Sequence, residues 1–165
     1  MNALGAMNVL VLGATGGTGR QVVAQALGKG HAVTALVRDP ARLEVAGQHL
    51  RVRTGDVRDD HALGDGMRGQ DVVISALGVG KSFKPAALIV ESTEHIVRAM
   101  ESQGVRRLVV TSAFGVGDTY RDTPFVPRLF IRLLLKDIYR DKHAGEEIIR
   151  RSGLDWTIVY PTGRR

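Results

Sequence analysis

Residues 8–19 read Asn-Val-Leu-Val-Leu-Gly-Ala-Thr-Gly-Gly-Thr-Gly. The four consecutive apolar residues, two of them β-branched, predict a buried parallel strand that stops at Gly13. The next segment, residues 20–27, carries apolar residues at helical spacing and predicts a helix with one buried face. A strand, a glycine-rich turn and a helix in this order form the context in which a dinucleotide-binding fingerprint is found.

Each glycine of this turn has a separate chemical reason. Gly13 can take the positive φ of a tight turn, Gly16 lets the backbone approach a pyrophosphate, and Gly19 lets the helix pack close to the strand. The helix start offers unpaired N–H groups to phosphates. The spacing is Gly-x-x-Gly-x-x-Gly rather than the commoner Gly-x-Gly-x-x-Gly, so a tight turn without a ligand is the alternative. The candidate cofactor-binding residues of this turn are Gly13, Thr15, Gly16, Gly17, Thr18 and Gly19.

The composition is that of an ordinary globular domain. The 165 residues are 44% hydrophobic and 24% charged, and we expect a single dinucleotide-binding domain over 1–165 with residues 1–6 as a disordered extension. The chain has no cysteine, which excludes disulfides, thiol catalysis and cysteine metal sites. No apolar run approaches the roughly 20 residues that span a bilayer, and residues 1–6 do not form a secretory signal, so the expected location is cytoplasmic. The formal net charge of +6 is compatible with an anionic ligand.

Strands and helices alternate along the rest of the chain. The other predicted strands cover residues 32–37, 50–54, 71–75, 107–112 and 154–160, and further helices are predicted over 60–67 and 85–103. Such alternation predicts an α/β fold with a doubly wound parallel sheet, the Rossmann fold. Right-handed crossovers give the strand order 3-2-1-4-5-6.

The end of the second strand bears on the choice of nucleotide. NAD-specific proteins usually place Asp or Glu there to hold the ribose 2′-hydroxyl. This chain has Arg38 at that point and Arg42 one turn further, and a guanidinium suits a 2′-phosphate. We therefore expect NADP(H) rather than NAD(H), although Asp39 is adjacent. The alternative is that Arg38 is an ordinary surface residue.

Other candidate contacts lie where strands end, because ligands of such sheets bind at the carboxyl ends of the strands. Asp56 is a candidate acceptor for the adenine amino group, whereas Asp59 is a candidate N-cap of the helix over 60–67. Small residues after the fourth strand allow the close approach of a ribose. The remaining candidate cofactor-binding residues are Val57, Ala76, Leu77, Gly78, Thr111, Tyr160, Pro161 and Thr162.

Five segments of the chain match motifs of a known enzyme family. They read Val-Leu-Gly-Ala-Thr-Gly-Gly-Thr-Gly-Arg at 11–20, Val-Arg-Asp-Pro-Ala-Arg-Leu at 37–43, Gly-Asp-Val at 55–57, Thr-Ser-Ala-Phe at 111–114 and Ser-Gly-Leu-Asp-Trp-Thr-Ile-Val-Tyr-Pro at 152–161. Together they resemble the atypical short-chain dehydrogenase/reductases, and most closely the NAD(P)H-binding proteins similar to biliverdin reductase B, also called flavin reductase. The resemblance runs from Met7 to Pro161. It implies a Rossmann fold, NADPH as the cofactor and hydride transfer to flavins or linear tetrapyrroles.

The chain departs from that family at two places. Family members normally continue well beyond the sixth strand, so we expect the C-terminal part that covers the substrate to be short or missing here. Typical short-chain dehydrogenases also place a Tyr four residues before the Lys of their acid/base pair, with a Ser on the fifth strand. In this chain Lys142 falls at the Lys position and Ile138 at the Tyr position, while Tyr139 is one residue late.

The absence of that Tyr favours a particular class of acceptor. Reduction of an ordinary ketone creates a localised alkoxide that needs a positioned acid, whereas a flavin or a bilin spreads the charge over a conjugated ring system. We therefore expect an NADPH-dependent reductase with Ser112 and Lys142 as its catalytic residues. Ser112 would hydrogen-bond the substrate or the nicotinamide, and Lys142 would bind ribose hydroxyls or add positive potential. In the alternatives, Ser112 is a strand-end cap and Lys142 a solvated helix residue.

Two other functions stay open at this point. The first is a nucleotide-binding module without turnover, which senses NADP(H) or serves as a partner domain. The missing Tyr and the short carboxyl end favour it. The second is epimerase chemistry on a nucleotide sugar, which is less expected because it needs the Tyr and a substrate domain.

Residues 124–140 combine basic and apolar side chains at helical spacing. Basic residues repeat every four positions within a broad apolar remainder, which predicts a core helix with a solvated face or, alternatively, a homodimer surface or, less expected, a membrane-surface helix. The five histidines are dispersed, and we expect no metal. Nucleic-acid-binding modules are missing and aromatics are only 5%, so the expected partner is a small-molecule acceptor, without nucleic acid or membrane.

Overall fold

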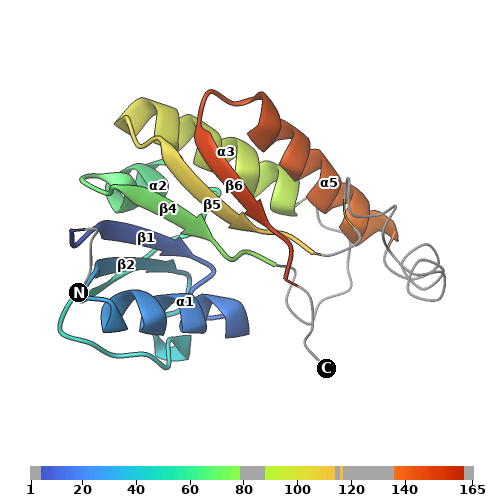
Figure 1. The fold of residues 1–165 in the computed structure, drawn as a ribbon. Helices are drawn as coiled ribbons and strands as arrows, with labels where there is room; N and C mark the ends of the chain where they lie inside the picture. The colour runs from blue at the N-terminus through green and yellow to red at the C-terminus, as the bar shows by residue number, and fades with distance from the viewer. Residues whose placement is uncertain (1–4, 79–87, 114–115, 117–135, 162–165) are drawn as a thin grey trace.

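The six predicted strands form one parallel sheet in the order β3-β2-β1-β4-β5-β6, as expected from the sequence. A computed structural model describes residues 5–78, 88–113, 116 and 136–161 (Figure 1). The strands are β1 Asn8–Leu12, β2 Ala32–Val37, β3 Leu50–Thr54, β4 Val72–Ser75, β5 Arg107–Thr111 and β6 Asp155–Val159. The predicted bounds of the strands are confirmed to within one residue at each end. The differences are in β4, β5 and β6, which are slightly shorter than predicted.

The helices lie on both sides of this sheet. They are α1 Gly17–Gly28, η1 Pro40–Arg42, α2 Asp60–Met67, α3 Leu88–Gln103 and α5 Lys136–Arg151. Figure 1 shows α1 against one face and α3 and α5 side by side along the other. This is the doubly wound Rossmann arrangement that the alternation of strands and helices predicts.

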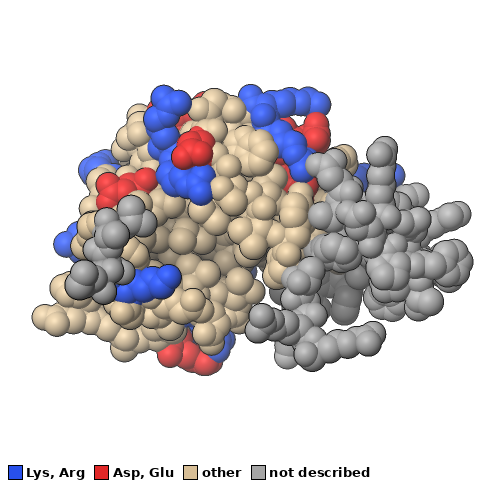
Figure 2. Space-filling model, in the orientation of Figure 1, with Lys and Arg blue, Asp and Glu red and all other residues tan. Residues whose placement is uncertain are grey.

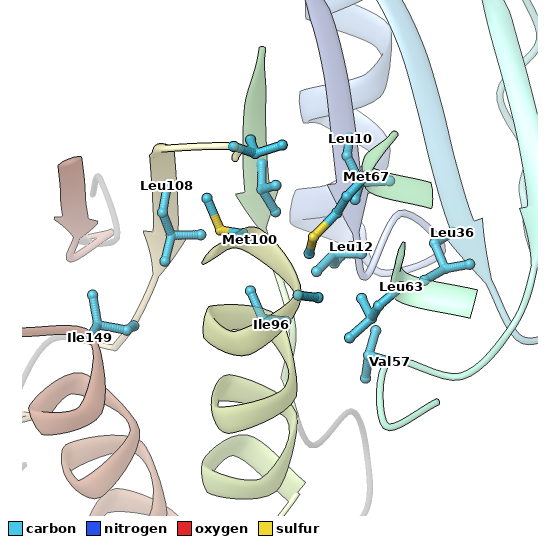
Figure 3. Packing of buried hydrophobic residues seen from close by; sticks show 13 residues of the cluster. Leu10, Leu12, Leu36, Val57, Leu63, Met67, Ile96, Met100, Leu108 and Ile149 are labelled. Atoms are coloured by element: carbon cyan, nitrogen blue, oxygen red, sulfur yellow. The ribbon is translucent and has the colours of Figure 1, made fainter. Parts of the chain in front are cut away.

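The alternation of side chains along β1 divides the core into two layers. Val9 and Val11 pack on the side of α1, with Val23 and Ala26 of that helix. Leu10 and Leu12 point to the opposite face and join a second cluster. Figure 3 shows this second cluster between the sheet and the helices α2, α3 and α5, with side chains that include Leu63, Met67, Ile96, Met100 and Ile149. Both faces of the central strand are therefore buried, as its uninterrupted apolar run predicts.

Asp59 is confirmed as the N-cap of α2. Its side chain accepts hydrogen bonds from the backbone N–H groups of His61 at 2.9 Å and Ala62 at 3.3 Å. We expect Asp59→Ala to lower the free energy of unfolding by about 1 kcal/mol, because two N–H groups lose their acceptor. Chemical denaturation measures the change, and Asp59→Asn, which keeps the acceptor oxygen, should stay within a few tenths of the wild type. Equal losses in both variants would contradict the capping role.

Candidate functional site

The turn between β1 and α1 is held tightly by two of its glycines. Gly13 has a φ of +77°, and a Cβ added there would lie 2.6 Å from the carbonyl oxygen of Ala76 on the neighbouring strand end. A Cβ added at Gly19 would overlap the carbonyl oxygen of Gly13. These two glycines are therefore required by the fold itself, for the tight turn and for close helix packing.

The two middle glycines are not required by packing. A Cβ at Gly17 would meet no atom within 4 Å, and one at Gly16 would only touch the carbonyl oxygen of Gly13 at 3.4 Å. Both are exposed where α1 begins, where no side chain caps the helix and no acidic residue occupies the first turn. The first N–H groups of α1 thus have no side-chain cap at the positive end of the helix dipole, which fits the pyrophosphate of a dinucleotide.

A cavity of about 340 Å³ extends from this turn along the carboxyl ends of the neighbouring strands. Its volume is in the range of small-molecule sites. It brings together twelve of the predicted cofactor-binding residues, namely Gly13, Thr15, Gly16, Gly17, Thr18, Arg38, Arg42, Asp56, Val57, Ala76, Leu77 and Gly78. Gly19 is buried under the turn beside this cavity.

Three charged residues border the larger cavity, namely Arg38, Arg42 and Asp56. Arg38 and Arg42 border the cavity and are exposed. Asp39 does not border it, and its carboxylate accepts the backbone N–H of Ala41 at 3.1 Å and caps η1. Asp56 accepts hydrogen bonds from the Arg58 guanidinium at 3.0 and 3.1 Å, which together with the charge of Arg38 lowers the pKa of the Asp56 carboxyl. The cavity therefore offers two guanidinium groups and one ionised carboxylate.

Arg20 braces the glycine turn, a role that the sequence analysis did not assign. Its Nε donates to the carbonyl oxygen of Thr15 at 3.0 Å, and its guanidinium forms an ion pair with Glu44. Arg20 thus ties the turn to Glu44, which lies just after η1. Arg42 is the last residue of η1. The proximity of Arg20 to the glycines in the sequence is the only sequence signal for this brace.

A second, smaller cavity of about 30 Å³ adjoins the first, and Leu77 borders both. Ser112, Thr111 and Lys142 border this smaller cavity, so the two predicted catalytic residues come together. Lys142 is not a solvated helix residue: burial lowers the pKa of its ammonium group, although the negative charges of Glu146 and Asp141 oppose the shift.

Asp141 fixes the start of α5, and with it Lys142, against α3. Its two carboxylate oxygens accept the backbone N–H groups of Ile89 and Val90 at 3.0 and 3.1 Å. These bonds join the beginnings of two helices that are far apart in the sequence. Gly145 helps the same contact, since a Cβ there would lie 3.1 Å from the Ile89 side chain.

Glu146 is the site residue that the sequence analysis missed. It is only 2% exposed and accepts hydrogen bonds from the Ser112 and Tyr160 hydroxyls at 2.5 and 2.8 Å. Arg150 forms an ion pair with it at 3.2 Å. Burial and the bond to Glu146 raise the pKa of the Tyr160 hydroxyl to about 12, which keeps that hydroxyl protonated. The only sequence signal was the Lys-x-x-x-Glu spacing, which places both side chains on one side of α5.

The remaining predicted residues either lie away from the larger cavity or fall outside the described residues. Tyr160 belongs to the Glu146 network and Pro161 is exposed after β6, and neither borders the larger cavity. Ile138, at the position of the expected Tyr, is buried, and burial raises the pKa of the half-buried Tyr139 hydroxyl. Thr162 and most of the proposed dimer segment 124–140 lie outside the described residues; only 136–140 are described, as the beginning of α5.

On the face drawn in Figure 2, the described basic side chains do not gather in one patch. Figure 2 shows basic side chains at several places on one face, mostly next to acidic ones. Among the described residues, no group of three or more His, Asp or Glu side chains is placed to hold a metal ion. In the same part of the chain, no helix combines the length and the apolar character needed to cross a membrane.

Comparison with known proteins identifies similar chains. A family model described as NAD(P)H-binding matches residues 13–164. A protein of Streptomyces griseus named (4-alkanoyl-5-oxo-2,5-dihydrofuran-3-yl)methyl phosphate reductase is 31% identical over 93% of this chain and 46% of its own. The chain spans about half the length of the curated relatives it matches.

Solved structures give the same picture. A Rossmann-fold NAD(P)-binding family protein from Shigella flexneri is 27% identical with a TM-score of 0.69, over 93% of this chain and 66% of that one. The anaerobilin reductase ChuY of Escherichia coli O157:H7 is 23% identical with a TM-score of 0.77, over 93% of this chain and 72% of that one. The second likeness concerns the fold alone.

Proposed function

Because the chain belongs to the NAD(P)H-binding family, we propose that it is an NADPH-dependent reductase that transfers a hydride to a flavin, a bilin-like molecule or another conjugated acceptor. The observation that carries this proposal is the junction of the two cavities at Leu77. The larger cavity suits a dinucleotide, and the smaller one brings Ser112 and Lys142 to its end. The reductase name of the Streptomyces relative supports the same reaction class.

The residues of the chain have separate tasks in this proposal. The turn at Gly16 and Gly17 and the start of α1 hold the pyrophosphate, while Arg38 and Arg42 hold the 2′-phosphate. A bound NADPH supplies the hydride from its nicotinamide ring. Ser112 hydrogen-bonds the nicotinamide or the acceptor, and the ammonium of Lys142 supplies positive potential where negative charge develops.

The buried Ile138 supports a conjugated acceptor. Counted from Lys142, Ile138 holds the position of the Tyr of typical short-chain dehydrogenases, and its side chain has no proton donor. A flavin or bilin needs no such strong acid, because its ring system spreads the charge. Water or a weak proton donor is therefore sufficient for the reduction of a conjugated acceptor.

Arg38→Ala tests the choice of nucleotide. We expect NADPH to bind about tenfold to a hundredfold more weakly, because one charge-assisted hydrogen-bond partner of the 2′-phosphate is lost. NADH, which has no 2′-phosphate, should bind about as before. Titration followed by nicotinamide fluorescence measures both, with Arg51→Ala as the control, since Arg51 is an exposed arginine of β3 that does not border the cavity. Equal weakening of both nucleotides would contradict the assignment of the 2′-phosphate to Arg38.

Turnover is tested separately with NADPH and FMN. Oxidation of NADPH above the rate of Ser112→Ala supports the reductase. NADPH binding without oxidation of any conjugated acceptor supports instead a nucleotide-binding module without turnover, which the apolar Ile138 also favours. Self-association through 124–140 and a cytoplasmic location stay predictions.

A further inference from the structure

The network around Glu146 gives its carboxylate only donors as partners. Ser112 Oγ donates to Oε1, and the Tyr160 hydroxyl and an Arg150 N–H both donate to Oε2. All three partners are donors, so the two carboxylate oxygens act as acceptors in each of these bonds. The direction of every one of these bonds is thereby fixed.

This direction determines what Ser112 can offer to the smaller cavity. A serine hydroxyl has one proton and two lone pairs, and here the proton is donated to Glu146. Two neighbouring hydroxyls behave in the same way, because Thr111 donates to the carbonyl oxygen of Ser75 at 2.9 Å and Thr93 donates to that of Ile89 at 2.6 Å. All three residues border the cavity, and their hydroxyls keep only lone pairs for a further partner. Lys142 borders the same cavity with the opposite property, since an ammonium group only donates.

We propose that Glu146 is a positioning residue that fixes Ser112 as a hydrogen-bond acceptor, so that the cavity takes an amide group, with the N–H on Ser112 and the carbonyl on Lys142. The cavity volume of about 30 Å³ exceeds the space that one water molecule needs, so the cavity has room for a small polar group. Two ligands of the proposed reductase carry such a group: the nicotinamide, with its carboxamide, and the conjugated acceptor, with a lactam or imide edge. The inference rests on the proposed function for these ligands.

Glu146→Gln is the substitution that reverses the arrangement. Arg150 and Tyr160 donate on one side of the side chain, so the amide oxygen of the glutamine should stay with them and its NH₂ group should face Ser112. Ser112 then accepts from the glutamine and turns its own proton toward the cavity. Ser112 then keeps one lone pair instead of two on the cavity side, next to its own proton, so a ligand N–H is expected to bind about tenfold more weakly.

Two measurements distinguish the two sources of the amide. In the first, calorimetry compares NADP⁺ with its analogue that carries a carboxylate in place of the carboxamide. If the cavity takes the carboxamide, the wild type prefers NADP⁺ by about tenfold, and Glu146→Gln reduces the preference to within about threefold. In the second, the KM for FMN is compared with that for a quinone that has no N–H. If the cavity takes the acceptor, only the KM for FMN rises in Glu146→Gln.

A double variant distinguishes a positioning role of Glu146 from a general loss of structure: Glu146→Gln is measured again in a chain that also carries Ser112→Ala. If Glu146 acts through Ser112, Glu146→Gln adds no further change in this background, whereas a merely structural role gives the same loss with and without Ser112. Glu147→Gln is the matched control, because it makes the same change on the neighbouring residue, which forms ion pairs with Arg150 and Arg151 and does not border the cavity. If Glu146→Gln does not fold, Ser112→Ala alone should abolish the discrimination, since it removes the acceptor.

The failure of this inference differs from the failure of the proposed function. An unchanged NADP⁺ preference together with an unchanged KM for FMN overturns the inference and leaves the reductase in place. Binding of NADP⁺ without any turnover overturns the reductase, and the comparison with the carboxylate analogue then still decides the inference. A chain that binds neither nucleotide overturns both.

Discussion

Gly19→Ala should destabilise the protein by about 3 kcal/mol or more, because the new methyl group cannot be accommodated without moving the backbone. The added Cβ would overlap the carbonyl oxygen of Gly13 and would lie 2.8 Å from the Cα of Ala14. Neither neighbour is the flexible end of a side chain, so α1 must shift away from β1. Since domains of this kind are stable by only about 5–15 kcal/mol, such a loss is large. Urea denaturation followed by circular dichroism measures it.

Gly17→Ala is the matched control for this substitution. The added Cβ at position 17 meets no atom within 4 Å, and alanine is the better helix former, so stability should stay within about 1 kcal/mol of the wild type. The same methyl group would project from the turn that borders the larger cavity, and we expect NADPH to bind at least about tenfold more weakly. An equal loss of stability in both variants would contradict the view that the fold requires Gly19 but does not require Gly17.

The sequence predicted the sheet well because local signals and general topology rules agree along this chain. Most strands are short apolar runs and β3 alternates apolar and polar residues, and the strand order follows from right-handed crossovers. The larger cavity could be predicted for the same reason. Parallel strands end at one edge of the sheet, so Arg38 and Asp56 had to lie near the glycine turn.

The smaller cavity could be predicted only in part. Ser112 and Lys142 were identified through their positions in family motifs, but the partners of Glu146 lie 34 and 14 residues away, at the ends of two different strands. No period or spacing within one helix indicates such a meeting. The Asp56–Arg58 pair is different, since its two members are separated by one residue and the sequence analysis did not consider it. The assignment of Ile138 to the expected position of the Tyr depends on a count from Lys142, and both residues lie in the one helix α5.

Lys142→Met should lower NADPH oxidation about a hundredfold while it raises the stability of the protein at neutral pH. The loss of activity follows if the ammonium group supplies positive potential to the reaction, because such groups contribute about 10²–10⁴-fold. The gain in stability follows from burial, which lowers the pKa of Lys142 in the folded state. Methionine has a similar length and no charge to desolvate. Steady-state kinetics and thermal unfolding at pH 7 measure the two effects.

The pH dependence of that stability difference identifies its cause. A lysine whose pKa is lowered by folding binds more protons in the unfolded state, so its cost to stability is present below the lowered pKa and disappears as the pH rises toward the ordinary value of 10.5. The Tm advantage of Lys142→Met over the wild type should therefore be largest near pH 7 and shrink toward pH 10. A constant difference would mean that methionine only packs better. If position 142 served stability alone, an apolar residue would be favoured there. A lysine that lowers stability beside Ser112 is then explained by the reaction rather than by the fold.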